Sequence, residues 1–386
     1  MTSLSRKLRK KLLDLANGEF DLLIALRPEH ISYCSGFKSM MHDTDRHHRM
    51  AVAFSADSAA LVCPRSDLGP ALEAIEPDLQ FHLYGRFIFR GITRPEPTRR
   101  ESLSPDWATA LSNAVGGLGL SNPRIGVDLS EPSLSLEAVQ HALRGFHLAD
   151  ASNLFLQARA TKLPEEIELL ARAAKIAESA IHDSLSALRP GNTEWHLASL
   201  IAARMTEAGA LPGFIVATSG PRSALADAYP SSRSIAQGDL IRLDIGCSVD
   251  GYWADTARTA VIGQPSNRIR DLFSVLRDGQ IAAMSAIEPG IAAEEVFRIA
   301  IEHIRSNGVP DYERHHVGHG IGRECFEYPR LAPGVHAVLS SGMVLCVETP
   351  YYELGWGGMM TEDTVVITEN GTTRLTTSSS ELIVLS

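Results

Sequence analysis

Four carboxylates and one imidazole in the C-terminal part of the chain are the residues best suited to chemistry. Each stands within its own short motif, and the five are Asp244, Asp255, His319, Glu348 and Glu362. Carboxylate oxygens with a single imidazole nitrogen suit Mn²⁺, Fe²⁺, Co²⁺ or Zn²⁺ better than a soft metal ion. The set has enough oxygens to bridge two ions, and two ions ~3.5–4 Å apart can share a hydroxide and polarise a substrate carbonyl. These residue types therefore predict a metal site that can assist hydrolysis.

A hairpin is predicted to bring the two aspartates together. Residues 240–245 have the apolar pattern of a buried strand, the Asp-Gly pair at 250–251 is typical of a hairpin turn, and residues 252–261 follow as the return strand. Asp244 and Asp255 are then expected to face each other across this hairpin.

Two further predicted strands place the two glutamates. Residues 343–347 run into Glu348, and residues 365–367 begin shortly after Glu362. A carboxylate at the end of an apolar strand is costly to bury unless a cation pairs with it. The position of the glutamates therefore favours a bound cation.

With these motifs the chain resembles the pita-bread metallopeptidases, which include methionine aminopeptidases, Xaa-Pro aminopeptidases, prolidases and creatinase relatives. The motifs at 244–255, 318–322, 347–350 and 361–364 match that family's dinuclear metal ligands one for one. The resemblance implies a homodimer and two divalent metal ions, Mn²⁺ first with Fe²⁺, Co²⁺ or Zn²⁺ as alternatives. It also implies an α/β (α+β) fold, in which a creatinase-like N-terminal domain precedes a pita-bread catalytic domain with internal pseudo-twofold symmetry.

The chain is expected to fold as two domains, residues 1–157 and residues 158–386. The first alternates strand and helix patterns and contains no catalytic motif. Its strands are expected at 20–26, 50–54, 59–63, 79–84 and 124–129. In the second domain, a Pro-Gly phrase at 188–191 between helical patterns recurs at 287–290, which supports two related halves around a shared sheet.

The resemblance also assigns roles around the metals. Glu348 is implied to be both a metal ligand and the general base, and His315 is implied to bind substrate. His316 takes that role if the register is one residue off, and a structural hydrogen bond to the sheet is the alternative for either histidine. Cys325, close after His319, is expected to be a packing residue rather than a nucleophile.

Three positions depart from the peptidase pattern. Asp227 and Phe326 stand where Xaa-Pro-cleaving relatives have histidines, and Met360 stands where they have an arginine. Without a histidine at Phe326, the site lacks a hydrogen-bond donor for the charge that develops on the substrate carbonyl oxygen. Without an arginine at Met360, it lacks a bidentate contact to a substrate carboxylate. The carboxylate of Asp227 instead favours a cationic group on the substrate. We therefore expect a substrate that is smaller than an ordinary Xaa-Pro dipeptide or carries positive charge, unless Asp227 faces solvent and another residue has replaced it.

The leading hypothesis is a metal-dependent hydrolase of a peptide or amide C–N bond, similar to Xaa-Pro dipeptidases and aminopeptidases, with a metal-bound hydroxide as nucleophile. One alternative keeps the fold and the metals but cleaves a non-peptide C–N or C–S bond of a small metabolite, cationic or neutral. Another alternative is a non-catalytic binding protein, which the complete ligand set disfavours. Metal content separates the binding protein from the enzymes, and product identification separates the two enzymes.

Composition limits the other classes of function. The net charge of −10, without a basic block beyond the first dozen residues, disfavours nucleic acid as a partner. No apolar run approaches the ~18 residues that a membrane span needs, and the basic start is expected to form an amphipathic surface helix rather than a secretory signal. The five scattered cysteines fit reduced thiols in a cytoplasm, which is the expected location.

The polar segment His42–Arg49 has three interpretations. Its histidines and aspartates are metal-ligand types, but an exposed polar loop explains them more simply. The family resemblance adds a third interpretation, in which the loop helps to shape the substrate pocket of the partner subunit in a dimer.

Overall fold

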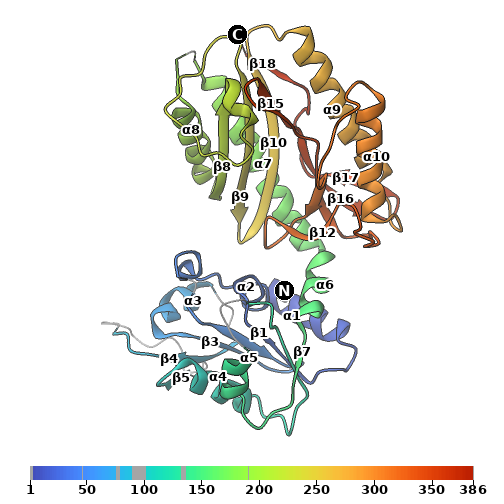
Figure 1. Cartoon of the computed structure of the whole chain (residues 1–386). Coiled ribbons are helices and arrows are strands. Elements are labelled where there is room, and N and C mark those ends of the chain that lie inside the picture. Colours follow the sequence, from blue (N-terminus) through green and yellow to red (C-terminus); the bar gives the residue numbers. More distant parts are fainter. Residues whose placement is uncertain are drawn as a thin grey trace. The chain divides into compact units, whose positions relative to one another are not determined.

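The structure is a computed structural model that describes residues 3–45, 47–74, 79–88, 101–131, 136–189 and 191–385. The chain divides into two compact units, Met1–Ala158 and Arg159–Ser386. Figure 1 shows both units and labels most of their helices and strands.

The N-terminal unit is a mixed α/β domain built on one seven-stranded sheet. Its strands lie in the order β5-β4-β3-β2-β1-β6-β7, and the pairs β1–β2 and β2–β3 are antiparallel whereas the others are parallel. The strands are β1 (Leu22–Ala25), β2 (Ala51–Phe54), β3 (Ala59–Pro64), β4 (Leu79–Tyr84), β5 (Glu101–Ser104), β6 (Ile125–Val127) and β7 (Leu148–Asp150). The helices are α1 (Leu4–Leu15), α2 (Pro28–Ser35), α3 (Leu68–Ala74), α4 (Trp107–Gly117), α5 (Leu136–Ala142) and α6 (Ser152–Ala160), the last of which crosses into the second unit. The five strands expected from the sequence are all present, as β1, β2, β3, β4 and β6.

The polar segment His42–Arg49 is tied to this unit, apart from Arg46, which lies outside the described residues. His48 Nε2 lies 2.6 Å from Asp67 Oδ2, and Ser39 Oγ donates to Asp67 Oδ1 over 2.9 Å. Among the described residues, the groups of His, Cys, Asp and Glu side chains close enough to share an ion include none from this segment. The structure therefore gives no support to a metal site there.

The C-terminal unit is built on a nine-stranded sheet. Seven strands lie in the order β12-β11-β13-β16-β10-β9-β8, while β17 pairs with β16 and β18 pairs with β10. The strands are β8 (Leu211–Ser219), β9 (Leu240–Val249), β10 (Tyr252–Ile262), β11 (Gly318–Gly320), β12 (Glu327–Arg330), β13 (Val344–Glu348), β16 (Glu362–Thr368), β17 (Gly371–Arg374) and β18 (Ile383–Leu385). A separate two-stranded sheet joins β14 (Tyr351–Glu353) to β15 (Gly357–Met359).

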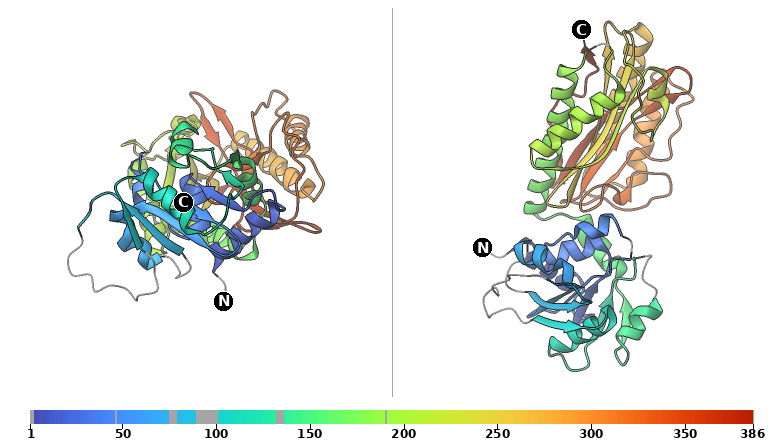
Figure 2. Two further views of the ribbon diagram at one scale, coloured as in Figure 1. Left: turned by 90° about the horizontal axis from the view of Figure 1, so that it is seen from below. Right: turned by 90° about the vertical axis from the view of Figure 1, so that its left-hand side faces the viewer.

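Two pairs of helices pack against the two halves of this sheet. The buried apolar side chains of α7 (Pro164–Ala187) and α8 (Glu194–Glu207) form one core with β8, β9 and β10, and those of α9 (Asn267–Ala286) and α10 (Ala293–Ser306) form another with β13 and β16. Figure 2 shows the green α7 and α8 and the orange α9 and α10 beside their strands. The chain thus runs through two helices and then strands twice, which is the internal symmetry expected from the sequence, although Pro190 of the first repeated phrase lies outside the described residues. In the described part of the chain, no helix has the length and apolar character needed to cross a membrane.

The hairpin of β9 and β10 sets the register of the polar side chains. The Asp-Gly pair at its tip, residues 250–251, has φ values of 50° and 79°, as a two-residue type I′ turn requires. This turn places Asp244 opposite Ala257 and Asp255 opposite Gly246. The expectation that the two aspartates face each other directly is therefore wrong: they are diagonal neighbours on one face of the sheet, because each lies two residues away from the partner of the other.

Candidate metal centre

The nine residues predicted for metal and substrate binding all line one cleft of about 600 Å³ in the C-terminal unit. They are Asp227, Asp244, Asp255, His315, His319, Phe326, Glu348, Met360 and Glu362. Arg314, Arg330 and Tyr352, which the sequence analysis did not select, line the same cleft. The fold therefore gathers the whole predicted set in one place.

The five candidate metal ligands come from five neighbouring strands. In spatial order, His319 lies on β11, Glu348 ends β13, Glu362 begins β16, Asp255 lies on β10 and Asp244 lies on β9. Glu348 and Glu362 are direct partners across the β13–β16 pair. Because side chains on neighbouring strands lie ~5 Å apart, one ligand from each strand builds a continuous row.

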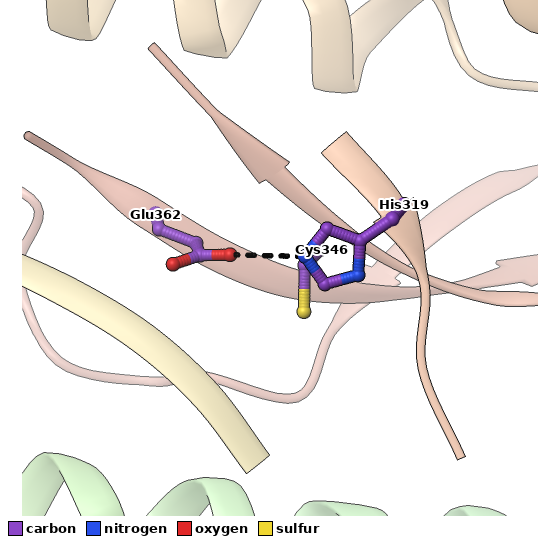
Figure 3. Close-up of side chains that lie close together, drawn as sticks. All are labelled: His319, Cys346 and Glu362. Carbon is purple, nitrogen blue, oxygen red and sulfur yellow. Dashed lines mark ion pairs between the residues drawn. The ribbon is translucent and has the colours of Figure 1, made fainter. Parts of the chain in front are cut away.

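Two overlapping groups of donor atoms are close enough to hold ions. One group joins Asp244, Asp255 and Glu362, and the other joins His319, Cys346 and Glu362, with the donor atoms of each group within 4.8 Å of one another. Figure 3 shows the second group, in which His319 Nε2 lies 3.9 Å from Glu362 Oε1. Glu362 belongs to both groups.

The burial of these carboxylates beside one another favours a bound cation. Burial, together with the charge of neighbouring carboxylates, raises the pKa values of Asp255 and Glu362 well above their usual range. Burial also raises the pKa of Asp244 to about 7, although Arg242 opposes the shift. Asp255 Oδ1 and Glu362 Oε2 are buried without a hydrogen-bond partner among the described residues. Buried, mutually repelling and unpartnered oxygens fit divalent ions, which would supply the missing charge.

His319 is prepared to act as a nitrogen ligand. Burial lowers its pKa to about 4, so the imidazole is neutral near pH 7. Its Nδ1 lies 3.0 Å from the carbonyl oxygen of Gly320, and its Nε2 lies 3.6 Å from Asp255 Oδ2. A hydrogen bond from Nδ1–H to the carbonyl leaves the lone pair of Nε2 directed to the carboxylates, as in a metal-ligating histidine.

The second histidine of the pair 315–316 is the one that contacts Glu348. His316 Nδ1 lies 2.9 Å from Glu348 Oε1, and Arg314 Nη2 lies 3.9 Å from Glu348 Oε2. Burial works to raise the pKa of Glu348, but the hydrogen bond from His316 and the positive charges of both neighbours lower it overall. His315 lines the cleft from an exposed position, and its ring meets the His316 ring edge-on at 4.3 Å.

Phe326 and Met360 occupy the cleft in different ways. The Phe326 ring is 52% exposed and lies 4.0 Å from the His319 ring. Met360 is only 4% exposed, and its sulfur lies 3.9 Å from the hydroxyl of Tyr352. The thiol of Cys325 donates to Asp255 Oδ2 over 3.0 Å, so this residue contacts a candidate ligand as well as packing.

A buried arginine holds the backbone just before Asp227, which lines the cleft. The Asp227 side chain is exposed and lies on the loop that follows β8. The guanidinium of Arg242 is fully buried and donates to the carbonyl oxygens of Ser223 at 2.9 Å, Leu225 at 2.7 Å and Ala226. Arg242 was missed in the sequence, although its position two residues before Asp244 places it on the same strand face.

Comparison with known proteins supplies the family. Residues 168–369 match metallopeptidase family M24, and residues 6–161 match the creatinase/prolidase N-terminal domain. The chain is 38% identical over 229 residues to the uncharacterized peptidase YqhT of Bacillus subtilis, and 37% identical over 227 residues to the Xaa-Pro dipeptidase of Pyrococcus furiosus. These matches cover 59% and 58% of this chain and 65% of each relative, so they span less than two thirds of the relatives' length.

A solved structure is similar over nearly the whole chain. The Xaa-Pro dipeptidase from Bacillus anthracis aligns with a TM-score of 0.80 and 26% sequence identity, over 98% of this chain and 100% of that one. The family match spans more than half of the present sequence, and both units have counterparts. The chain therefore belongs to metallopeptidase family M24, with the pita-bread fold and the creatinase-like N-terminal domain that its motifs predicted.

Proposed function

We propose that this protein is a dinuclear metal-dependent hydrolase of a peptide or amide C–N bond, with Xaa-Pro dipeptides as the reference substrates. One observation carries the proposal: five ligand side chains from five neighbouring strands converge in a cleft that all predicted substrate residues also line. The relatives named Xaa-Pro dipeptidase support the substrate class.

Two divalent ions are proposed to be held by the row of ligands from His319 to Asp244. When bound, they would polarise the scissile carbonyl and lower the pKa of water. Mn²⁺ is proposed first because four of the five side chains offer carboxylate oxygens, and Fe²⁺, Co²⁺ and Zn²⁺ are the alternatives.

Glu348 is proposed as the general base. It is buried and ionised, because its contact with His316 lowers its pKa despite the burial. A carboxylate so placed receives a proton from the attacking water and passes it to the leaving nitrogen. His316 orients the carboxylate, and His315, exposed at the cleft, is proposed to contact the substrate.

The remaining charges of the cleft suit a zwitterionic substrate. Asp227 is a carboxylate that attracts an ammonium group, whereas Arg314 and Arg330 are cations that attract a carboxylate. A free dipeptide carries both groups. That Phe326 and Met360 shift the preference away from ordinary Xaa-Pro dipeptides stays a prediction, as do the homodimer and the cytoplasmic location.

The two alternative functions have less support. A binding protein without catalysis has no use for a complete ligand set, and the comparisons name peptidases. Cleavage of a non-peptide C–N or C–S bond uses the same metals, but no residue of the cleft favours it over peptide cleavage.

Product release from a defined panel tests the proposal. The Mn²⁺-loaded protein is assayed with Xaa-Pro dipeptides, with their N-acetylated and C-amidated forms and with small cationic amides, and metal content is measured in the same samples. We expect free dipeptides to be cleaved, each blocked form to be cleaved less, and Glu348→Ala to be inactive. About two bound metals without cleavage of any amide would contradict the proposed reaction, and absence of bound metal would contradict the proposed site.

A further inference from the structure

The two groups of donor atoms in the metal centre differ in chemistry. The group of Asp244, Asp255 and Glu362 offers oxygen alone, whereas the group of His319, Cys346 and Glu362 offers nitrogen, sulfur and oxygen. Hard ions prefer oxygen, and borderline or soft ions prefer nitrogen and sulfur. Two positions that share Glu362 therefore have different preferences.

The fold directs the sulfur of Cys346 to the centre. Cys346 lies on β13 two residues before Glu348, so both side chains share one face of the strand, and it is the direct partner of His319 on β11. Figure 3 shows its sulfur beside the ion pair of His319 and Glu362. Cys346 is 0% exposed, and its sulfur is buried beside the candidate ligands His319 and Glu362.

The contacts of this thiol leave it available to a metal ion. Its sulfur lies 3.8 Å from the carbonyl oxygen of Asp255 and 3.5 Å from Thr364 Oγ1, and both are weak contacts for sulfur. Donor atoms that bind one ion at ~2.0–2.3 Å lie up to ~4.6 Å apart. The atoms of this group lie within 4.8 Å of one another, so a small movement of side chains suffices.

Another cysteine of the same sheet, Cys247, lies on the opposite face from Cys346. Cys247 on β9 donates from its sulfur to the carbonyl oxygen of Ala173 in α7, and it belongs to the apolar core between helices and sheet. Cys247 thus faces the helices, whereas Cys346 faces the carboxylates.

We propose that Cys346 supplies a sulfur donor to the metal position beside His319, so that this position selects Zn²⁺, Co²⁺ or Cd²⁺ while the oxygen-only position takes Mn²⁺. The inference rests on the proposed two-metal site and deepens it. When the metal–sulfur bond forms, the thiol proton passes to solvent, and no oxidant or reductant is needed. The centre is then asymmetric.

Titration of the metal-free, full-length protein with Co²⁺ tests the sulfur ligand. A cobalt–thiolate bond gives a near-ultraviolet charge-transfer absorption that oxygen and nitrogen ligands do not give. We expect this band in the wild type and its loss in Cys346→Ser, which still binds cobalt. Cys247→Ser and Cys325→Ser are matched controls and keep the band, although Cys325 contacts Asp255.

A competition experiment measures the selectivity itself. Zn²⁺ and Mn²⁺ are offered together to each metal-free protein, and bound metals are counted by elemental analysis. We expect the ratio of Zn²⁺ to Mn²⁺ affinity at one position to fall at least about tenfold in Cys346→Ser, because thiolate favours zinc strongly over manganese. An unchanged ratio would contradict the inference.

The outcomes separate the inference from the proposed function. Two bound cobalt ions without a sulfur band would overturn the sulfur ligand and leave the two-metal site intact. A band that disappears in Cys325→Ser but persists in Cys346→Ser would show that Cys325, and not Cys346, binds the metal. No cobalt binding would overturn both proposals. If Cys346→Ser does not fold, X-ray absorption of the zinc-loaded wild type and of Cys325→Ser decides the question, with a sulfur neighbour at ~2.3 Å expected in both.

Discussion

His316 Nδ1 lies 2.9 Å from Glu348 Oε1, which makes the histidine three residues before His319 the polar neighbour of the proposed general base. His315, one residue earlier, is exposed at the cleft instead. The two adjacent imidazoles therefore have different surroundings. His316 contacts the carboxylate of Glu348, whereas His315 is exposed at the cleft. The difference allows their roles to be separated by kinetics.

His316→Ala is expected to lower kcat by about 10- to 100-fold with little change in KM. Loss of a residue that contacts a metal-ligating side chain typically lowers activity by this factor. His315→Ala is expected to raise KM more than it lowers kcat, because its ring faces the cleft. Steady-state kinetics with the best substrate of the panel, together with metal content, measures both effects.

His316→Asn is the matched control for this pair. Its amide nitrogen can donate to Glu348 from a position close to that of Nδ1, so part of the lost kcat is expected to return. Equal kinetic changes for His315→Ala and His316→Ala would show that the contact with Glu348 has no separate role.

Removal of the metals is expected to destabilise the protein. Burial and the neighbouring carboxylates raise the pKa values of Asp255 and Glu362, so the metal-free centre stores repulsion that ions relieve. An ion at 100 times its Kd adds about 2.7 kcal/mol to the free energy of unfolding. Thermal unfolding with chelator, and again with Mn²⁺ restored, measures the difference.

Glu362→Gln provides the control for that experiment. The neutral amide removes the cost of burying an acid whose pKa is raised by its surroundings, so the metal-free variant is expected to have a Tm at or above that of the metal-free wild type. The same variant is expected to gain little from Mn²⁺. A variant that is less stable without metal, yet gains as much from Mn²⁺ as the wild type, would contradict the role of Glu362 as a bridging ligand.

A buried ion cluster makes stability depend on acid. Glu327 Oε1 lies 2.5 Å from Arg159 Nη2, and its Oε2 lies 3.0 Å from Lys162 Nζ. Burial works to raise the pKa of Glu327, but the two cations lower it overall, from 4.5 to about 2. A lowered pKa stabilises the fold above the unfolded value of 4.5, and this stabilisation is lost as the pH falls towards 2.

Glu327→Gln is expected to lower the free energy of unfolding by about 3–5 kcal/mol at pH 7, because it leaves Lys162 buried without its anion and leaves Arg159 with Glu324 alone, whose Oε2 lies 2.7 Å from Nη2. Between pH 4.5 and pH 2.5 the gap to the wild type is expected to narrow. Urea unfolding of both proteins across this range, with chelator present throughout, checks the prediction. A gap that stays constant with pH would show that Glu327 does not titrate as its surroundings imply.

The five candidate ligands could be selected from the sequence because each lies in a local pattern, and the structure places all five in one cleft. An apolar strand that stops at a carboxylate, or an Asp-Gly turn between two such strands, is visible within ten residues of sequence. The diagonal placement of Asp244 and Asp255 was not predicted, because the first strand was expected at 240–245, whereas β9 continues to Val249, which pairs with Tyr252 across the turn.

The supporting residues were not predictable, because their partners lie far away in the chain. Arg242 matters through three carbonyl oxygens of the loop around Leu225, and Arg314 through its approach to Glu348. No spacing rule connects such segments. The role of Cys346 likewise depends on the pairing of β11 with β13, which no local motif encodes.

The substrate contacts that depart from the family pattern provide the last prediction. Phe326 is half exposed beside His319, so Phe326→His has room for an imidazole at the carbonyl of a bound substrate. A donor at such a position is worth about 100- to 1000-fold in rate. We expect Phe326→His to raise kcat/KM for Xaa-Pro dipeptides by about 10- to 100-fold, measured as released proline, and the double variant with Asp227→His to gain less, because it loses the contact proposed for the substrate ammonium group.

Met360→Arg is the contrasting variant. Met360 is only 4% exposed beneath Tyr352, so an arginine there must bury an unpaired charge and is expected to destabilise the fold rather than restore a contact to the substrate carboxylate. If Phe326→His gains nothing while Met360→Arg gains activity, the altered specificity lies at the carboxylate end of the substrate. If neither variant gains, these three positions do not set specificity, and the cationic pair of Arg314 and Arg330 becomes the part of the cleft that selects the substrate.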